Sequence, residues 1–216
     1  MTAERNGPHQ GQPLVTAGTH LDDAGAAVVL VHGRGATAES IVQMAEEFHR
    51  EGVAFLAPQA AGNTWYPNPF TAPVETNEPG RTSGLRAIAD AIDEVNDANI
   101  PTDRVLILGF SQGACLASEY VARDPRRYGG LAVLSGGLIG ETVDPDEYDG
   151  DLERTPVFFG CSDSDPHIAE ERVHESARVL QQLNGDVTER LYPGMGHTVN
   201  RDELDRVAEM VERLGG

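Results

Sequence analysis

The sequence predicts an α/β fold, in which a mostly parallel central sheet is covered by helices on both faces. Three observations indicate this fold class. Blocks rich in Val, Ile and Leu recur along the chain, segments of helical periodicity separate them, and most of the blocks are apolar throughout. Strands that are covered on both faces are expected to be apolar at every position. The 216 residues, 39% of them hydrophobic, suffice for one compact domain with a substantial core.

Six apolar blocks are expected to form the main strands of the sheet. An uncertain seventh element, either an edge strand or a hairpin, is expected around residues 14–21. The six strand candidates are residues 26–31, 53–57, 105–110, 131–134, 157–160 and 187–192.

Five segments are expected to be helical because their apolar residues recur every three or four positions. The clearest example carries Leu85, Ile88, Ile92 and Val95 on one stripe and acidic residues on another. Asn200 and Glu203 form a plausible capping box for the last helix. The other helices are predicted at about residues 37–50, 112–123, 166–183 and 204–214.

Residues 14–216 are predicted to form a single domain, preceded by a polar N-terminal tail at residues 1–13. Two connections, residues 58–83 and 136–156, are too long for simple turns between strands and helices. The first is aromatic and the second acidic. Long loops in compact domains are usually functional or disordered.

The charge of the chain excludes several classes of function. Thirty-five Asp and Glu residues stand against 16 basic residues, all of them Arg, which gives a net charge of −19. A chain without lysine has no Walker-A lysine, no Schiff base to pyridoxal phosphate and no lysine nucleophile. An acidic surface repels phosphate and anionic headgroups, so we expect no nucleic-acid partner and no stable membrane association.

Two interpretations of the acidity remain open, namely solubility and adaptation to a salt-rich cytoplasm. At ~1 M salt the Debye length is only ~3 Å, which screens the repulsion between like charges. We favour the halophilic interpretation, which predicts loss of fold or activity on dialysis to low salt.

The cysteines and the N-terminal segment indicate a cytoplasmic protein. Cys115 and Cys161 cannot make a disulfide framework, and neither has the paired spacing of a zinc site. Residues 1–13 contain no apolar signal-peptide core, and the apolar run at residues 26–31 is too short to cross a bilayer. Because neither cysteine has the spacing of a zinc site, we also expect no metal at the site.

Ser111 is the strongest candidate for a catalytic residue. It lies at the centre of Gly109-Phe110-Ser111-Gln112-Gly113, a G-x-S-x-G motif between a predicted strand and a predicted helix. Such a sharp turn holds the serine in strained backbone geometry and lifts its hydroxyl above the sheet edge, and the glycines remove side chains that would clash there. The alternative interpretation is a serine that only caps the helix.

A serine hydroxyl is a weak nucleophile and needs a base and an acid, which this motif takes in the chain order Ser, acid, His. His197 follows the last predicted strand in a glycine-flanked loop, although an ordinary loop histidine is the alternative. Asp163 and Asp165 follow the preceding strand and compete for the role of the acid. Asp165 precedes Pro166 and also matches a helix N-cap, a role compatible with catalysis.

Two backbone amides are candidates for stabilising an oxyanion. The amide of Gln112 follows the nucleophile directly and is an orphan donor at a helix N-terminus. The amide of Arg34 belongs to the turn His32-Gly33-Arg34-Gly35, which follows the first core strand. Two such donors would hold the negative oxygen of a tetrahedral intermediate.

Together these residues resemble the phospholipase/carboxylesterase family of the α/β-hydrolase superfamily, which includes bacterial carboxylesterases and acyl-protein thioesterases. The resemblance covers roughly residues 26–215. It is carried by Leu30-Val31-His32-Gly33-Arg34-Gly35, Ala57-Pro58, Gly109-Phe110-Ser111-Gln112-Gly113, Asp163-Ser164-Asp165-Pro166 and Gly196-His197.

The resemblance implies an α/β-hydrolase fold and a serine-dependent hydrolase of carboxylic esters or thioesters that needs no cofactor or metal. Asp165 matches the family's acid before proline. The chain departs from better-known members at Arg34, where a leucine is common, and at Ala169, where a proline is common. The Arg34 guanidinium could recognise a carboxylate or pair with one of the acids nearby.

The aromatic loop offers candidate walls for a substrate pocket. Trp65, Tyr66 and Phe70 are interleaved with prolines, and Met195 lies two residues before His197. Rigid apolar side chains of this kind can line an acyl pocket, and the alternative for the aromatic residues is a small core that holds the loop.

We therefore expect a serine hydrolase that cleaves small-molecule esters or thioesters through an acyl-enzyme intermediate, with Ser111, His197 and Asp165 as the triad. Two alternatives remain open: an acyltransferase that uses the same site, and a non-catalytic receptor for a small ligand on the same fold. A homodimer also remains open.

Overall fold

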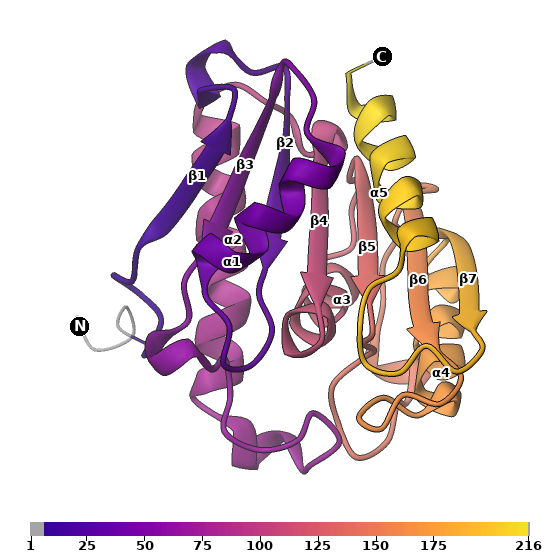
Figure 1. The fold of residues 1–216 in the computed structure, drawn as a ribbon. Helices are drawn as coiled ribbons and strands as arrows, with labels where there is room; N and C mark the ends of the chain where they lie inside the picture. The colour runs from indigo at the N-terminus through magenta and orange to yellow at the C-terminus, as the bar shows by residue number, and fades with distance from the viewer. Residues whose placement is uncertain (1–6, 216) are drawn as a thin grey trace.

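The computed structural model describes residues 7–215 and has the predicted α/β architecture (Figure 1). One seven-stranded sheet runs in the order β1-β3-β2-β4-β5-β6-β7. Only β1 is antiparallel to its neighbour, β3, and all other neighbours are parallel. The parallel strands therefore end at one common edge of the sheet, the lower edge in Figure 1.

The six predicted core strands are confirmed, each to within two residues at either end. The uncertain element around residues 14–21 is a single edge strand, which is followed by a short 3-10 turn and not by a hairpin. The strands are β1 (Leu14–Gly18), β2 (Ala26–Val31), β3 (Val53–Pro58), β4 (Val105–Phe110), β5 (Gly130–Leu134), β6 (Pro156–Ser162) and β7 (Asp186–Tyr192).

Helices cover both faces of the sheet. One face packs against α2 (Gly80–Asp97), α3 (Gln112–Arg123) and α4 (Glu170–Gln182). The other packs against α1 (Ala38–Met44) and α5 (Arg201–Leu214). Two apolar clusters result, one on each side, and burying each large apolar side chain in them stabilises the fold by roughly 1.5–3 kcal/mol.

Two helices differ from the prediction at their ends. The segment predicted as one helix at residues 37–50 is α1 followed by a 3-10 turn, Ala45–Phe48. The helix predicted from residue 166 begins at Glu170 and has Ala169 as its N-cap. The prediction that Asp165 caps this helix is therefore wrong, because Asp165 accepts hydrogen bonds from the amides of His167 and Ile168 in a separate turn.

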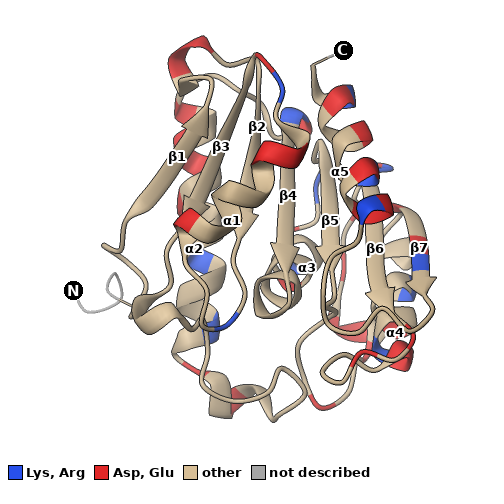
Figure 2. Cartoon of the chain, viewed as in Figure 1, with Lys and Arg blue, Asp and Glu red and all other residues tan. Residues whose placement is uncertain are grey.

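Charged residues lie on the helices, the loops and the edge strand β7, and strands β2–β6 contain none (Figure 2). Within residues 7–215, no helix combines the length and the apolar composition needed to cross a bilayer. The same residues contain no group of three or more His, Cys, Asp or Glu side chains placed to hold a metal ion.

Residues 7–13 do not form the free polar tail that the sequence predicts, and residues 1–6 lie outside the described part of the chain. His9 is only 4% exposed. Its Nε2–H donates to the Trp65 carbonyl at 2.8 Å, and its Nδ1 accepts from the Ala61 amide at 3.0 Å. Burial lowers the pKa of His9. A neutral imidazole therefore fastens this segment to the aromatic loop.

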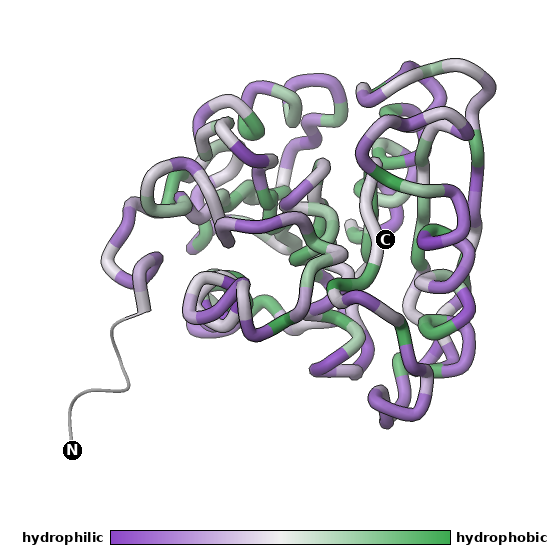
Figure 3. The backbone as a smooth tube through the Cα atoms, turned by 90° about the horizontal axis from the view of Figure 1, so that it is seen from below, coloured by the Kyte–Doolittle hydropathy of each residue, from purple (hydrophilic) through white to green (hydrophobic). Residues whose placement is uncertain are grey.

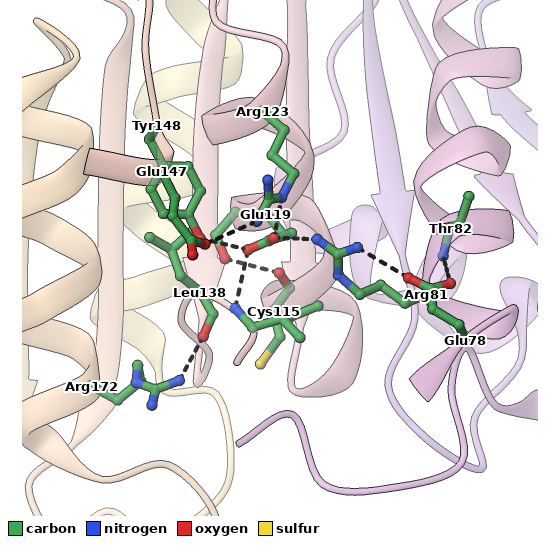
Figure 4. A network of polar contacts seen from close by, with 12 residues as sticks. Glu78, Arg81, Thr82, Cys115, Glu119, Arg123, Leu138, Glu147, Tyr148 and Arg172 are labelled. Carbon is green, nitrogen blue, oxygen red and sulfur yellow. Dashed lines mark hydrogen bonds and ion pairs between the residues drawn. The ribbon is translucent and has the colours of Figure 1, made fainter. Parts of the chain in front are cut away.

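A buried carboxylate, Glu119 on α3, holds the long loop at residues 136–156 (Figure 4). One oxygen is paired with Arg81 of α2 and Arg123 of α3. The other accepts from the Ile139 amide at 3.1 Å and from the Tyr148 hydroxyl at 3.2 Å. Because both oxygens are satisfied, this buried charge joins two helices to the loop.

Arg172 of α4 fastens the beginning of the same loop. Its guanidinium donates to the carbonyls of Leu138, Gly140 and Glu141 at 2.8–3.0 Å and lies 5.5 Å from the centre of the Phe70 ring. Both long loops are thus ordered by arginines with defined partners.

Candidate active site

The candidate catalytic residues all come from loops at the carboxyl edge of the parallel strands. Figure 3 looks onto this edge. Arg34 follows β2, Ser111 follows β4, Asp165 follows β6 and His197 follows β7. Open α/β sheets bind their ligands at this edge.

Ser111 occupies a sharp turn between β4 and α3. Its backbone has φ 56° and ψ −121°, a left-handed conformation that is unfavourable for a residue with a side chain. The turn is held by the Ser111 amide, which donates to the Leu134 carbonyl at 3.0 Å. Although Ser111 stands at the N-cap position of α3, its hydroxyl makes no capping hydrogen bond. The hydroxyl is therefore available for another partner.

The glycines on either side of Ser111 are required by close backbone contacts. A Cβ on Gly109 would lie 2.3 Å from the Gly113 carbonyl oxygen. A Cβ on Gly113 would lie 2.0 Å from the Val31 carbonyl oxygen. Any side chain at either position would displace the sharp turn that carries Ser111, which we call the serine elbow.

The imidazole of His197 lies between Ser111 and Asp165. Nε2 is 2.8 Å from the Ser111 hydroxyl, and Nδ1 is 2.7 Å from Oδ2 of Asp165. Because a carboxylate can only accept, Nδ1 carries the proton and Nε2 is free to accept from the serine. The structure thus brings the three predicted triad residues into one hydrogen-bonded chain.

The carboxylate that takes part in this chain of hydrogen bonds is Asp165 and not Asp163. The Asp165 side chain is fully buried. Burial by itself would raise the pKa of Asp165, but hydrogen bonds from His197 and from the amides of His167 and Ile168 outweigh it and hold the pKa below its usual value. Asp163 points to the other side of the loop, where it accepts from the Gly194 amide at 2.9 Å.

Several groups that the sequence analysis did not select hold His197 in place. The buried Ser162 hydroxyl accepts from the amide of Gly196 at 3.0 Å. The rings of Phe110 and His167 lie 5.2 Å and 4.8 Å from that of His197. Of these groups, only His167 could have been selected from the sequence. It lies two residues after Asp165, in the turn that places its ring beside His197.

The two predicted oxyanion donors belong to segments that are next to Ser111. Gln112 is its direct neighbour, and Gly33 approaches so closely that a Cβ there would be 3.3 Å from the Ser111 Cβ. Within residues 7–215, neither the Arg34 amide nor the Gln112 amide has a protein acceptor. The Gln112 side chain is fully engaged, since it accepts from the Trp65 amide and donates to the Tyr66 carbonyl.

The Arg34 guanidinium contacts backbone carbonyls of the aromatic loop. It donates to the carbonyls of Tyr66, Pro67 and Asn68 at 2.9–3.0 Å. No carboxylate among residues 7–215 forms an ion pair with it, so of the two alternatives for this side chain the pairing with a nearby acid is not found. Arg34 instead joins the turn after β2 to the loop after β3.

A cavity of about 410 Å³ opens at Ser111. We call it the nucleophile cavity. Its walls include two of the predicted aromatic residues, Tyr66 and Phe70. It is lined by Arg34, Tyr66, Pro67, Pro69, Phe70, Ser111, Gln112, Cys115, His167, Ile168 and His197.

Two predicted wall residues do not line this cavity. Trp65 is fully buried behind it, and its indole N–H donates to the His32 carbonyl at 2.8 Å. Trp65 therefore belongs to the small core that holds the loop. Met195 points toward α5, where its sulfur accepts from the Asn200 side chain at 2.8 Å.

Cys115 lines the nucleophile cavity but is not a rival to Ser111. Burial raises the pKa of its thiol to about 12. A thiol is nucleophilic only as the thiolate, so this group stays protonated and unreactive near neutral pH.

Comparisons with known proteins are consistent with this geometry. The phospholipase/carboxylesterase family model matches residues 19–214. Acyl-protein thioesterase 1 of Neurospora crassa is 26% identical, over 88% of this chain and 87% of that protein. The crystal structure of a phospholipase/carboxylesterase from Dyadobacter fermentans has a TM-score of 0.90 and 38% identity, and covers 96% of this chain and 99% of that chain. A carboxylesterase from Bacillus cereus shares the fold, with a TM-score of 0.73 and 17% identity over 95% of each chain.

Proposed function

Since the chain belongs to the phospholipase/carboxylesterase family and is a carboxylesterase-type hydrolase, we propose that it cleaves small carboxylic esters or thioesters with Ser111, His197 and Asp165 as its triad. The observation that carries this proposal is the pair of hydrogen bonds at 2.8 Å and 2.7 Å that joins the three side chains through one imidazole.

In the first half-reaction, Ser111 Oγ attacks the carbonyl carbon of the ester while His197 Nε2 takes the hydroxyl proton. Asp165 holds the Nδ1–H tautomer and stabilises the imidazolium that forms. The tetrahedral intermediate then collapses as Nε2 returns the proton to the leaving oxygen or sulfur, which departs and leaves an ester between Ser111 and the acyl group.

In the second half-reaction, His197 takes a proton from a water molecule, whose oxygen attacks the acyl-enzyme carbonyl. The second intermediate collapses and releases the acid, and Ser111 regains its proton from the imidazolium. The same imidazole thus protonates the leaving group as an acid and deprotonates water as a base.

The negative oxygen of both intermediates would be held by the amides of Arg34 and Gln112. Free N–H groups at the helix start and in the turn after β2 suit this role, because they require no rearrangement as charge develops. Loss of one such donor slows acyl transfer by about 10²–10³-fold in other serine hydrolases.

The direct test replaces Ser111 with alanine and measures the turnover of p-nitrophenyl acetate. We expect kcat to fall by a factor on the order of 10⁴ or more, with an unchanged circular dichroism spectrum. Retained turnover would contradict the assignment of the nucleophile.

The two aspartates of the loop after β6 provide a matched pair. Asp165→Asn should lower kcat by about 10⁴-fold, because an amide no longer fixes the imidazole tautomer. Asp163→Asn, in the same loop, should lower it far less. Equal losses would contradict the role of Asp165.

A further inference from the structure

A second cavity, of about 260 Å³, lies between helix α1 and the turn after β2. We call it the α1 cavity. It is bounded by α1, by the end of β4 and by the segment that follows His197. Its main lining residues are Gly33, Ala36, Ile41, Met44, Phe110 and Val199.

Two wall residues of the α1 cavity lie next to the reacting groups. Gly33, in its wall, lies so close to Ser111 that a Cβ on it would be 3.3 Å from the Ser111 Cβ. Phe110, also in its wall, packs against the His197 ring at 5.2 Å, whereas His167 of the nucleophile cavity packs against the same ring at 4.8 Å. The imidazole of His197 therefore contacts a wall residue of each cavity.

Most residues that line the α1 cavity are apolar, and two of its three polar side chains, His32 and Ser40, have partners in the protein; the third is Thr198. His32 is fully buried, with Nδ1 bonded to the Gly33 carbonyl and Nε2 accepting from the Ala60 amide. Burial lowers the pKa of His32, which favours the neutral ring. The Ser40 hydroxyl donates to the Thr37 carbonyl at 2.7 Å.

An ester has two arms that diverge from its carbonyl carbon. The acyl arm stays bonded to Ser111 in the intermediate, so it requires the nucleophile cavity, which contains Ser111 and Gln112. The leaving oxygen receives its proton from His197 Nε2, so the second arm must pass beside the imidazole. The α1 cavity is near that imidazole, because its wall includes Phe110, which packs against the His197 ring, and Thr198, the residue after His197.

We propose that the α1 cavity binds the alcohol arm of the ester, as an uncharged alkyl or aryl group. This inference rests on the proposed function and adds a preference for esters of apolar alcohols to it. At ~30 Å³ per water-sized group, the cavity has room for roughly eight non-hydrogen atoms. Each methylene buried there should raise kcat/KM by about fourfold, from ~0.8 kcal/mol per methylene.

The test varies the two arms of the substrate separately. Methyl, butyl and hexyl acetate change the alcohol at a fixed acyl group, and p-nitrophenyl acetate, butyrate and hexanoate change the acyl group at a fixed alcohol. Wild type should prefer hexyl over methyl acetate by a hundredfold or more in kcat/KM, if the fourfold gain applies to most of the added methylenes.

Two variants should change this preference in opposite directions. Ala36→Phe fills the cavity and should lower the hexyl-to-methyl ratio at least tenfold, whereas Met44→Ala enlarges it and should shift the optimum to longer alcohols. The acyl preference should change less than twofold in both. Circular dichroism and thermal unfolding report whether each variant is folded, and Met44→Ala alone suffices if Ala36→Phe does not fold.

Three results would overturn the inference. One is a wild-type kcat/KM that is the same for methyl, butyl and hexyl acetate. Another is an equal effect of the folded variants on methyl and hexyl acetate, and the third is an effect on the acyl series instead. In each of these the enzyme still hydrolyses esters, so the proposed function stands. A wild type that hydrolyses no ester would contradict both.

Discussion

Gly113 and Val31 are packed backbone to backbone, so that a Cβ on Gly113 would lie 2.0 Å from the Val31 carbonyl oxygen. Gly113 is in the first turn of α3, just after the serine elbow. Val31 is the last residue of β2 and precedes the turn that carries Arg34. This contact therefore sets the spacing between Ser111 and the Arg34 amide.

Gly113→Ala should disrupt that spacing. Overpacking of this kind destabilises proteins by about 1–3 kcal/mol, and we expect ester turnover to fall by more than tenfold in whatever protein remains folded. Gly25→Ala is the matched control, because a Cβ there meets nothing within 4 Å. Urea unfolding and p-nitrophenyl acetate turnover measure both effects, and a Gly113→Ala enzyme as active as the control would contradict the account.

Arg34→Leu separates the two roles of this residue, since it retains the backbone amide and removes three hydrogen bonds to the aromatic loop. We expect kcat/KM to fall about tenfold, or ~1.4 kcal/mol, because the wall of the nucleophile cavity loosens. The loss should be equal for p-nitrophenyl butyrate and for mono-p-nitrophenyl succinate. A loss confined to the succinate would show that the guanidinium recognises a carboxylate. Arg178→Leu, at an exposed position on α4, serves as the control.

Glu119→Ala should be strongly destabilising, because it removes the fully buried partner of Arg81, whose side chain is only 9% exposed and keeps only the partly exposed Glu78 as a partner. Breaking a buried ion pair costs about 3–5 kcal/mol. Glu212→Ala removes an exposed partner of Arg50 and should cost at most about 1 kcal/mol. Urea unfolding compares the two, and similar small losses would mean that the Glu119 network does not hold the loop.

Glu203 should make stability depend on pH. Burial raises the pKa of this carboxyl to about 7, from ~4.3 in an unfolded chain. Its contribution to stability is therefore fully present below about pH 4 and is lost as the pH rises through 7. Relative to wild type, Glu203→Gln should gain up to about 3 kcal/mol in the free energy of unfolding between pH 4 and pH 8. A difference that does not change with pH would contradict the buried, protonated carboxyl.

The sequence predicted the strands and the serine elbow well because both depend on local patterns. Continuous apolar blocks form the doubly covered strands, and a G-x-S-x-G motif between a strand and a helix is typical of this sharp turn, because a Cβ at either glycine would clash there. The family resemblance that these motifs predicted is confirmed by the match over residues 19–214. The capping box of Asn200 and Glu203 is also confirmed.

Features that depend on distant contacts were not predictable from the sequence. The choice between Asp163 and Asp165 depends on which way one loop turns, and Trp65 and Tyr66 are neighbours of which only the second reaches the cavity. His9 meets Trp65 across 56 positions of the chain, and Arg34 meets Asn68 across 34. No local pattern encodes such partners.

The most direct test of the central claim, that His197 activates Ser111, is labelling with a fluorophosphonate followed by peptide mass spectrometry. An activated serine forms a phosphonyl ester with this reagent, so the experiment does not require the natural substrate to be known. We expect a single adduct on Ser111 in wild type, and its loss in His197→Ala with the fold retained. A folded protein that gives no adduct, or an adduct that forms equally fast without His197, would contradict the account.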